Sequence, residues 1–154
     1  MLKVIQGGIQ AVVEDWPGRL GYMGAGMAPA GAVDNVALGL GNLLVGNEVG
    51  EAGIELAVGL FSAEFEADAV IAIAGADLKA TINGQPAPRW ESFKVNAGDK
   101  LAFGAYGEKG FRAYSGDGHP RDRRYGHHEG TASGGTIPVP VRGSGCIRKP
   151  GCRQ

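Results

Sequence analysis

The sequence contains few of the residues on which metal, redox and membrane proteins depend. It has two cysteines, Cys146 and Cys152, and three histidines among 154 residues. A zinc site or a disulfide framework needs more such residues at regular spacing, so neither is expected and no metal ligand is predicted. No apolar run approaches the roughly 18 residues of a membrane-spanning helix. Residues 1–10 also lack the features of a signal peptide. We therefore expect a cytoplasmic protein without a membrane partner.

Charge and apolar content divide the chain into two parts. Residues 1–114 carry 8 basic and 13 acidic side chains (−5), whereas residues 115–154 carry 7 and 3 (+4), which together give the overall −1. The second part has few large apolar side chains, so it cannot offset the entropy lost on ordering. The sequence therefore predicts a folded body over residues 1–114 and a disordered tail over residues 115–154, with the boundary between Tyr114 and Ser115.

The body has the pattern of a mainly β domain with one prominent helix. Asn83-Gly84 is a strong two-residue hairpin signal, and residues 97–99 supply a similar corner. Many short strands at close spacing favour a β-barrel or sandwich. Alternating apolar residues predict strands within residues 1–10, 54–58, 60–67, 69–74, 78–82, 93–95, 100–103 and 111–114.

The helix is predicted over residues 33–45. Asp34 suits the positive end of the helix dipole, and Gly46-Asn47 can adopt the left-handed conformation that ends a helix. Gly39 and Gly41 are expected to mark a close approach to the sheet. The face expected to pack on the sheet has helical spacing and comprises Val33, Val36, Ala37, Leu40, Leu43 and Leu44.

The segment over residues 14–34, EDWPGRLGYMGAGMAPAGAVD, is the least ordinary in the body. Its lone arginine, Arg19, lies among glycines. An arginine fork suits a planar carboxylate or carbamate, and glycines let backbone amides approach an anion. The alternative is a surface loop whose arginine pairs with Asp15 or Asp34. A dinucleotide fingerprint at residues 24–26 is rejected, because position 29 is a proline and no βαβ unit follows.

The tail carries two further motifs, and neither is predicted to form a binding site. Adjacent His127 and His128 lie in a glycine-rich stretch, where paired histidines are more often incidental than metal-binding. The basic cluster over residues 121–124 has no interleaved aromatic residues beyond Tyr125 and adjoins an acidic body. Nucleic-acid binding is therefore not expected.

Five motifs together resemble one protein family. They are DWPGRLGY (15–22), PAGAVD (29–34), GNLLVGN (41–47), the glutamate of GIEL (Glu55) and IAGAD (73–77). In this order and spacing the body is similar to the biotin-dependent carboxyltransferases. That family comprises allophanate hydrolase subunit 2, the carboxyltransferase domain of urea carboxylase, the C component of 5-oxoprolinase and kinase-inhibitor-like relatives. The resemblance covers residues 1–114, the first half of such a protein.

The resemblance implies a cyclophilin-like β-barrel that is the first of two similar subdomains. It implies transfer of a carboxyl group from carboxybiotin to a small amide or urea-type acceptor, or a part in ATP-driven opening of 5-oxoproline. The implied partners are allophanate hydrolase subunit 1, other 5-oxoprolinase subunits, or a biotin carboxylase and a biotin carrier. Because the chain has no Met-Lys dipeptide, biotin would arrive on another domain or chain, and ATP would bind within the complex.

Site residues follow from motif membership together with residue chemistry. A carboxyl transfer needs donors that hold the carboxylate and a group that accepts a proton from the acceptor nitrogen. Arg19 is the expected carboxylate holder, with Asp15 or Asp34 orienting it, and these three form the predicted catalytic set. The predicted substrate-binding set comprises Tyr22, Asn47, Gly21 and Gly31.

Departures from the family pattern shape the functional expectation. Ala30 replaces a usual serine, and the sequence after Tyr114 lacks the family's apolar strand, which suggests a frameshift near Ser115. The chain is then a truncated subunit that is inactive alone. The alternative is a non-catalytic regulatory or binding module, similar to the kinase-inhibitor-like relatives, that binds a kinase, a peptide or a partner subunit. A third hypothesis is a product that folds poorly because it lacks its second subdomain.

Overall fold

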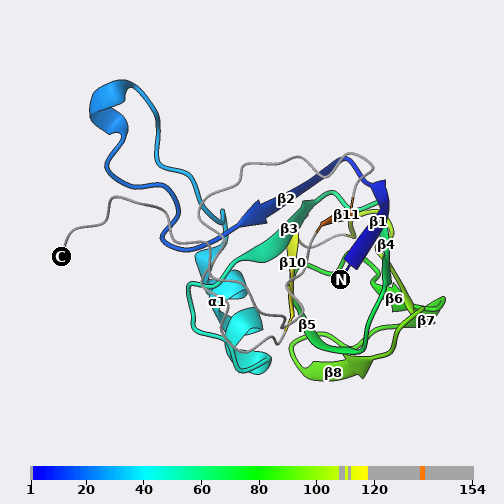
Figure 1. Cartoon of the computed structure of the whole chain (residues 1–154). Helices are drawn as coiled ribbons and strands as arrows, with labels where there is room; N and C mark the ends of the chain where they lie inside the picture. Colours follow the sequence, from blue (N-terminus) through cyan, green and yellow to red (C-terminus); the bar gives the residue numbers. More distant parts are fainter. Residues whose placement is uncertain (1, 108–109, 111, 118–135, 138–154) are drawn as a thin grey trace.

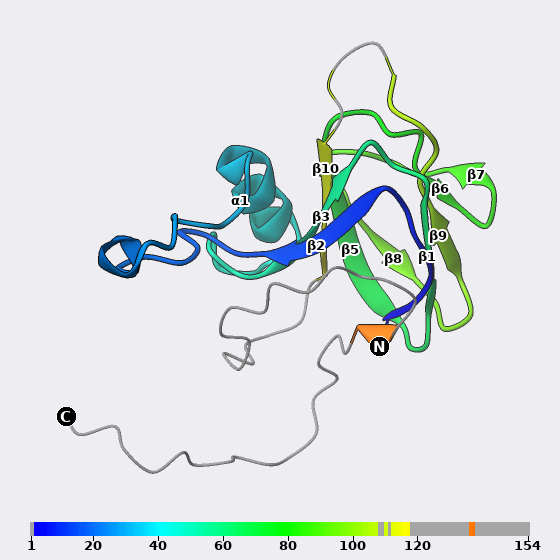
Figure 2. The same ribbon diagram turned by 90° about the horizontal axis from the view of Figure 1, so that it is seen from above.

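Two antiparallel sheets and one α-helix make up the body. The computed structural model describes residues 2–107, 110, 112–117 and 136–137. One sheet has the strand order β11-β1-β4-β9-β6-β7, and the other has the order β2-β3-β10-β5-β8. Both sheets curve around a common interior (Figures 1 and 2). The expected mainly β fold with one prominent helix is confirmed.

Burial alternates along the central strand of the first sheet. β4 (Phe61–Phe65) is buried at every second residue, as a strand with one face in the core must be. It pairs with β1 (Leu2–Gly7) on one side and with β9 (Lys100–Ala102) on the other. The remaining strands of this sheet are β6 (Thr81–Ile82), β7 (Gln85–Pro86) and β11 (Thr136–Ile137).

The second sheet is covered on both faces at its centre. Every residue of β3 (Gly53–Ala57) is buried, because one face meets the core and the other lies under the helix. β10 (Arg112–Asp117) pairs with β3 and with β5 (Ala69–Gly75). The outer strands are β2 (Gln10–Glu14) and β8 (Ser92–Val95).

Two apolar clusters hold the body together. The larger lies between the sheets and contains Phe61 and Phe103, whose rings meet edge to face with centroids 6.2 Å apart. The smaller lies between the helix and the outer face of the second sheet and contains Ala37, Leu38, Ala74 and Tyr114. The smaller cluster holds the helix against the second sheet. The segment just before this helix carries the candidate site.

The helix α1 (Asn35–Leu44) packs with the opposite face to the one predicted. Its buried residues are Ala37, Leu38, Gly39, Gly41 and Asn42. Apart from Ala37, the face predicted to be buried is exposed: Val33 65%, Val36 65%, Leu40 44%, Leu43 54% and Leu44 36%. The prediction was wrong because the small residues on the other face allow a closer approach than leucine does. A Cβ added to Gly41 would lie 3.6 Å from the Cβ of Ala74 on β5, so the expected close approach is confirmed there.

The turns are formed as the sequence predicts. Asn83 and Gly84 connect β6 to β7 with φ of 51° and 80°. Gly46 ends α1 with φ of 81°, and its N–H donates to the Leu43 carbonyl at 3.1 Å. Positive φ at both hairpin positions is the geometry that Asn-Gly favours.

Few of the described residues belong to the predicted tail. β10 continues through Asp117, so Ser115 and Gly116 belong to the second sheet. Thr136 and Ile137 pair with Lys3 and Leu2 of β1. The rest of the tail, to which the predicted disorder, the suggested frameshift and the histidine, cysteine and arginine motifs refer, lies outside the described residues. No helix among the described residues is long and apolar enough to cross a membrane.

Candidate functional site

The segment with the predicted carboxylate holder forms an arm that projects from the body. The arm, residues 15–33, leaves the second sheet after β2 and returns directly into α1 (Figure 1). Its outer end holds a short 3-10 helix, η1 (Met23–Ala25). Both views show this end extending away from the two sheets (Figures 1 and 2).

Two glycines allow the outgoing and the returning segment of the arm to pass close to each other at its base. Gly18 has φ of 74°, and a Cβ there would lie 1.8 Å from the Ala30 carbonyl oxygen. Gly31 has φ of 121°, and its Cβ would lie 3.0 Å from the Asp15 carbonyl oxygen. The Ala32 N–H also donates to that Asp15 carbonyl at 3.2 Å. Larger residues at the crossing would force the limbs apart.

Hydrogen bonds within the arm hold its outer part. The N–H groups of Ala25 and Met27 donate to the Tyr22 carbonyl at 2.9 and 3.2 Å. Arg19 lies half-buried across the arm, and its Nη2 donates to the Ala28 carbonyl at 3.2 Å. The guanidinium is therefore held by the returning limb of the arm.

A buried polar network ties the end of the arm to the second sheet. Glu55 on β3 is 2% exposed, and its Oε2 accepts from the Tyr114 hydroxyl at 2.8 Å and from the Val33 N–H at 2.9 Å. Its Oε1 accepts from Arg112 Nε at 2.9 Å. A buried carboxylate is tolerated when it is paired and hydrogen-bonded, as it is here.

The same network positions the start of α1. The Tyr114 hydroxyl accepts from the Asp34 N–H at 2.7 Å while it donates to Glu55. Asp34 is the N-cap, and its Oδ1 accepts from the Ala37 N–H at 3.0 Å. Both backbone amides at the end of the arm are therefore bound, one by Glu55 and one by Tyr114.

The pKa of Tyr114 reflects its buried position beside Glu55 and Asp34. Burial, reinforced by the neighbouring Glu55 and Asp34 carboxylates, raises the pKa of Tyr114 above its ordinary value of 10.0, although the Asp34 N–H opposes the shift. The hydroxyl is therefore protonated at neutral pH and can donate to Glu55.

A second polar contact fixes the far end of α1. Asn42 is fully buried, and its Nδ2 donates to the Glu51 carbonyl at 2.7 Å and to the Val49 carbonyl at 3.3 Å. Its Oδ1 accepts from Asn47 Nδ2 at 3.4 Å. Asn47 thus supports the loop that follows the helix.

The structure brings some of the predicted site residues together and separates others. Asp34 and Asn47 flank opposite ends of a ten-residue helix, which is about 15 Å long, so they do not converge. Arg19, Gly21 and Tyr22 lie on the arm, and Asp15 and Gly31 lie at its base. The roles assigned to these seven residues stay predictions.

The sequence interpretation assigned no site role to the three residues of the buried network. Glu55 belongs to a family motif, and Arg112 and Tyr114 belong to the strand predicted over residues 111–114, but none of the three has a predicted site role. One signal was present, since Glu55 is a charged residue within an otherwise apolar strand between Ile54 and Leu56. Such a carboxylate needs partners when the strand is buried on both faces.

No cluster of the kind that binds a metal occurs in the described part of the chain. The described residues contain no group of three or more His, Cys, Asp or Glu side chains placed to hold an ion. The groups of the arm that can bind a ligand are its hydrogen-bonding groups and the guanidinium of Arg19.

The fold and the anchored arm define a mainly β domain whose hydrogen-bond donors suit an anion. Comparison with known proteins shows the family of this domain. Residues 25–116 match the family described as carboxyltransferase domain, subdomain A and B, and the chain belongs to that family. The match extends from the outer end of the arm into β10.

Relatives of known name support this assignment. A protein of Emericella nidulans whose name assigns it as a urea carboxylase is 39% identical over 113 residues, which are 73% of this chain and 9% of the relative. The C component of the Escherichia coli 5-oxoprolinase is 33% identical over 114 residues, 74% of this chain and 36% of the relative. The crystal structure of the Kluyveromyces lactis urea carboxylase is 31% identical with a TM-score of 0.71, over 75% of this chain and 10% of that one. The chain therefore spans about a tenth to a third of these relatives.

Proposed function

We propose that this chain supplies part of a biotin-dependent carboxyltransferase that acts on a small amide or urea-type acceptor, within a urea carboxylase or 5-oxoprolinase assembly. The observation that carries this proposal is an arm with a single guanidinium, anchored by a buried network, in a member of this family. The names of the relatives do not distinguish a urea carboxylase assembly from a 5-oxoprolinase assembly. A urea carboxylase and a 5-oxoprolinase component match over nearly the same share of the chain, 73% and 74%.

Arg19 is the residue proposed to hold the carboxyl group. Its side chain is fixed by the Ala28 carbonyl, and the arm is fixed to the sheet through Val33 and Glu55. A donor that is held in place before the substrate binds stabilises developing charge without reorganisation. Asp15 is favoured over Asp34 to orient Arg19, because Oδ1 of Asp34 already caps the helix.

The donor set of the arm fits the carboxylate of carboxybiotin, which would supply the activated carboxyl group when bound. A guanidinium beside glycines accommodates a planar anion, and a Cβ at Gly21 would meet nothing within 4 Å. Residues that would hold the group are Arg19 and, through backbone or hydroxyl donors, Gly21 and Tyr22. The biotin itself, and any ATP, would come from partner domains such as a biotin carboxylase and a carrier.

The test is a complete carboxyltransferase in which residues 2–117 replace the matched stretch of the Escherichia coli 5-oxoprolinase C component, assembled with the other subunits of that enzyme. Substrate turnover is measured for the parent and for Arg19→Ala, Arg19→Lys and Lys94→Ala. Loss of one anion-holding donor lowers kcat about 100- to 1,000-fold. Arg19→Lys is expected to recover part of this loss, and Lys94→Ala, at an exposed position of β8, is expected to change nothing.

An assembled parent without turnover would contradict the proposed function. Unchanged turnover in Arg19→Ala would remove the role of Arg19 while leaving the family assignment intact.

A further inference from the structure

Arg19 directly follows the point at which the outgoing and the returning segment of the arm pass each other. A Cβ added to Gly18, the residue before it, would lie 1.8 Å from the Ala30 carbonyl oxygen and 2.7 Å from the Gly31 Cα. Because packed backbone atoms cannot overlap, a shift of the returning segment at this point displaces Gly18 as well. The position of Arg19 therefore depends on the position of residues 30–31.

The returning segment is bound to the second sheet two residues further on. The Val33 N–H donates to Oε2 of Glu55 at 2.9 Å, and the next N–H, that of Asp34, donates to the Tyr114 hydroxyl at 2.7 Å. Glu55 lies on β3 and Tyr114 lies on β10, and these two strands pair with each other. The two hydrogen bonds thus fix where the returning segment meets the outgoing one.

Both acceptors are themselves held firmly. Glu55 and Tyr114 are 2% and 1% exposed, and the Tyr114 hydroxyl donates to Oε2 of Glu55 at 2.8 Å. Oε1 of Glu55 accepts from Arg112 Nε at 2.9 Å. Tyr114 also belongs to the apolar cluster of Ala37 and Leu38 under the helix. A buried network whose members are satisfied is rigid, so the sheet gives the arm a fixed anchor.

We propose that Glu55 and Tyr114 are positioning residues for Arg19. They hold the returning segment, and the returning segment holds the outgoing one, so the guanidinium is in place before the carboxyl group binds. A donor placed in advance needs no reorganisation during the reaction, and a misplacement on the order of 1 Å can lower the rate about 100-fold. The role of Arg19 rests on the proposed function, whereas the anchor rests on the hydrogen bonds of Val33 and Asp34.

The first experiment is a double-mutant cycle in the Escherichia coli 5-oxoprolinase C component that carries residues 2–117, assembled with the other subunits of that enzyme. Tyr114→Phe and Glu55→Ala are each made in the presence of Arg19 and of Arg19→Ala, and kcat and KM are measured. Tyr114→Phe should lower kcat about tenfold when Arg19 is present. In Arg19→Ala it should lower kcat less than about twofold, because the group that it positions is gone. Glu55→Ala should follow the same pattern with a larger effect.

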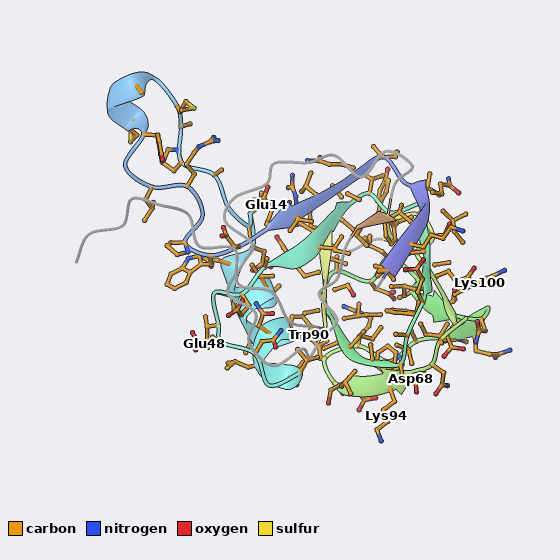
Figure 3. The ribbon with its side chains drawn as sticks, viewed as in Figure 1. Glu14, Glu48, Asp68, Trp90, Lys94 and Lys100 are labelled. Atoms are coloured by element: carbon orange, nitrogen blue, oxygen red, sulfur yellow. The ribbon has the colours of Figure 1, made fainter. Side chains whose placement is uncertain are left out.

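The matched control is Lys94→Ala, which lies on the side of the body away from the arm (Figure 3). It should leave kcat unchanged with Arg19 and with Arg19→Ala. A purely structural role of Tyr114 would instead lower turnover by the same factor in both cases, since both enzymes would lose the same share of folded protein.

The second experiment needs no turnover and uses the full chain. Backbone ¹⁵N relaxation measures the order parameters of Arg19 and Ala30 in folded molecules, so the values do not depend on how much of the chain is unfolded. The parent should give about 0.85 at both residues, and Tyr114→Phe should lower both toward the value of about 0.6 that marks a flexible backbone. Phe103, whose N–H donates to the Phe61 carbonyl at 2.8 Å, is the control and should not change.

Two results would overturn the proposal. One is a loss of kcat in Tyr114→Phe that is equal with Arg19 and with Arg19→Ala. The other is an order parameter of Arg19 that stays at the parent value in both Tyr114→Phe and Glu55→Ala. If Glu55→Ala does not fold, Tyr114→Phe decides alone, because phenylalanine keeps the packed ring. A parent enzyme without turnover contradicts the proposed function only, and the order parameters then decide whether the anchor holds the arm.

Discussion

The interior of the body and the region formed by the arm and α1 use apolar residues in opposite ways. Between the sheets, Leu56 and Phe61 are almost fully buried, whereas Leu40 on α1 and Met23 on the arm are 44% and 71% exposed. The one buried carboxylate of the described chain, Glu55, lies where the two regions meet. This contrast shows that the large apolar side chains between the sheets form the main core, whereas those on the arm and on the outer side of α1 remain exposed.

The largest expected effect separates the two regions directly. Leu56→Ala should lower the free energy of unfolding by about 2–5 kcal/mol, because it leaves a cavity between the sheets. Leu40→Ala, on the exposed side of α1, should change it by less than about 1 kcal/mol. Urea denaturation followed by circular dichroism measures both. Equal losses would show that the outer side of α1 is already covered in the isolated chain.

The next effect concerns the junction of the two regions. Glu55→Ala removes the acceptor for Arg112, Tyr114 and Val33, and should cost about 3 kcal/mol because those donors lose their partner. Glu66→Ala, at an exposed position after β4, should cost less than about 0.5 kcal/mol. The same denaturation assay applies. A small effect of Glu55→Ala would mean that the arm is not held by this network.

Much of the body could be predicted from sequence, since alternation and turn residues locate β4, β5 and the Asn83-Gly84 hairpin. The packed face of α1 could not, because both sides of this helix contain apolar residues. Periodicity favours the larger residues, whereas the sheet selects the smaller side, Ala37 and Gly41, for a close approach. The network also escaped prediction, because Glu55 lies 57 and 59 positions from its partners Arg112 and Tyr114. Only strand pairing brings these residues together.

A smaller effect concerns Tyr114 and depends on pH. Its folded-state pKa is raised above 10.0, so its protonated form stabilises the fold fully below pH 10, and this stability is lost as pH rises above 10. Tyr114→Phe should lower the free energy of unfolding by about 1–3 kcal/mol at pH 7. The difference between parent and variant should narrow above pH 10. Tyr106→Phe, at an exposed tyrosine, serves as the control. A constant difference at all pH values would contradict the raised pKa.

The smallest effect tests the link between the arm and the helix. Asp34→Ala removes the N-cap acceptor for the Ala37 N–H and should cost about 1 kcal/mol. Asp34→Asn keeps an acceptor and should cost only about a few tenths of a kcal/mol. Thermal denaturation compares the two variants with the parent. Equal losses would mean that the carboxylate charge of Asp34, rather than its cap, stabilises the fold.

The most direct measurement is the reactivity of single cysteines on the two sides of α1. Cys146 and Cys152 are replaced by serine, and Leu38→Cys and Leu40→Cys are labelled separately with a maleimide at low protein concentration. Leu38 is 1% exposed and Leu40 is 44% exposed, so labelling at position 40 should be at least tenfold faster. Fast labelling at position 38 with protection at position 40 would contradict the packing of α1, which buries Leu38 and exposes Leu40.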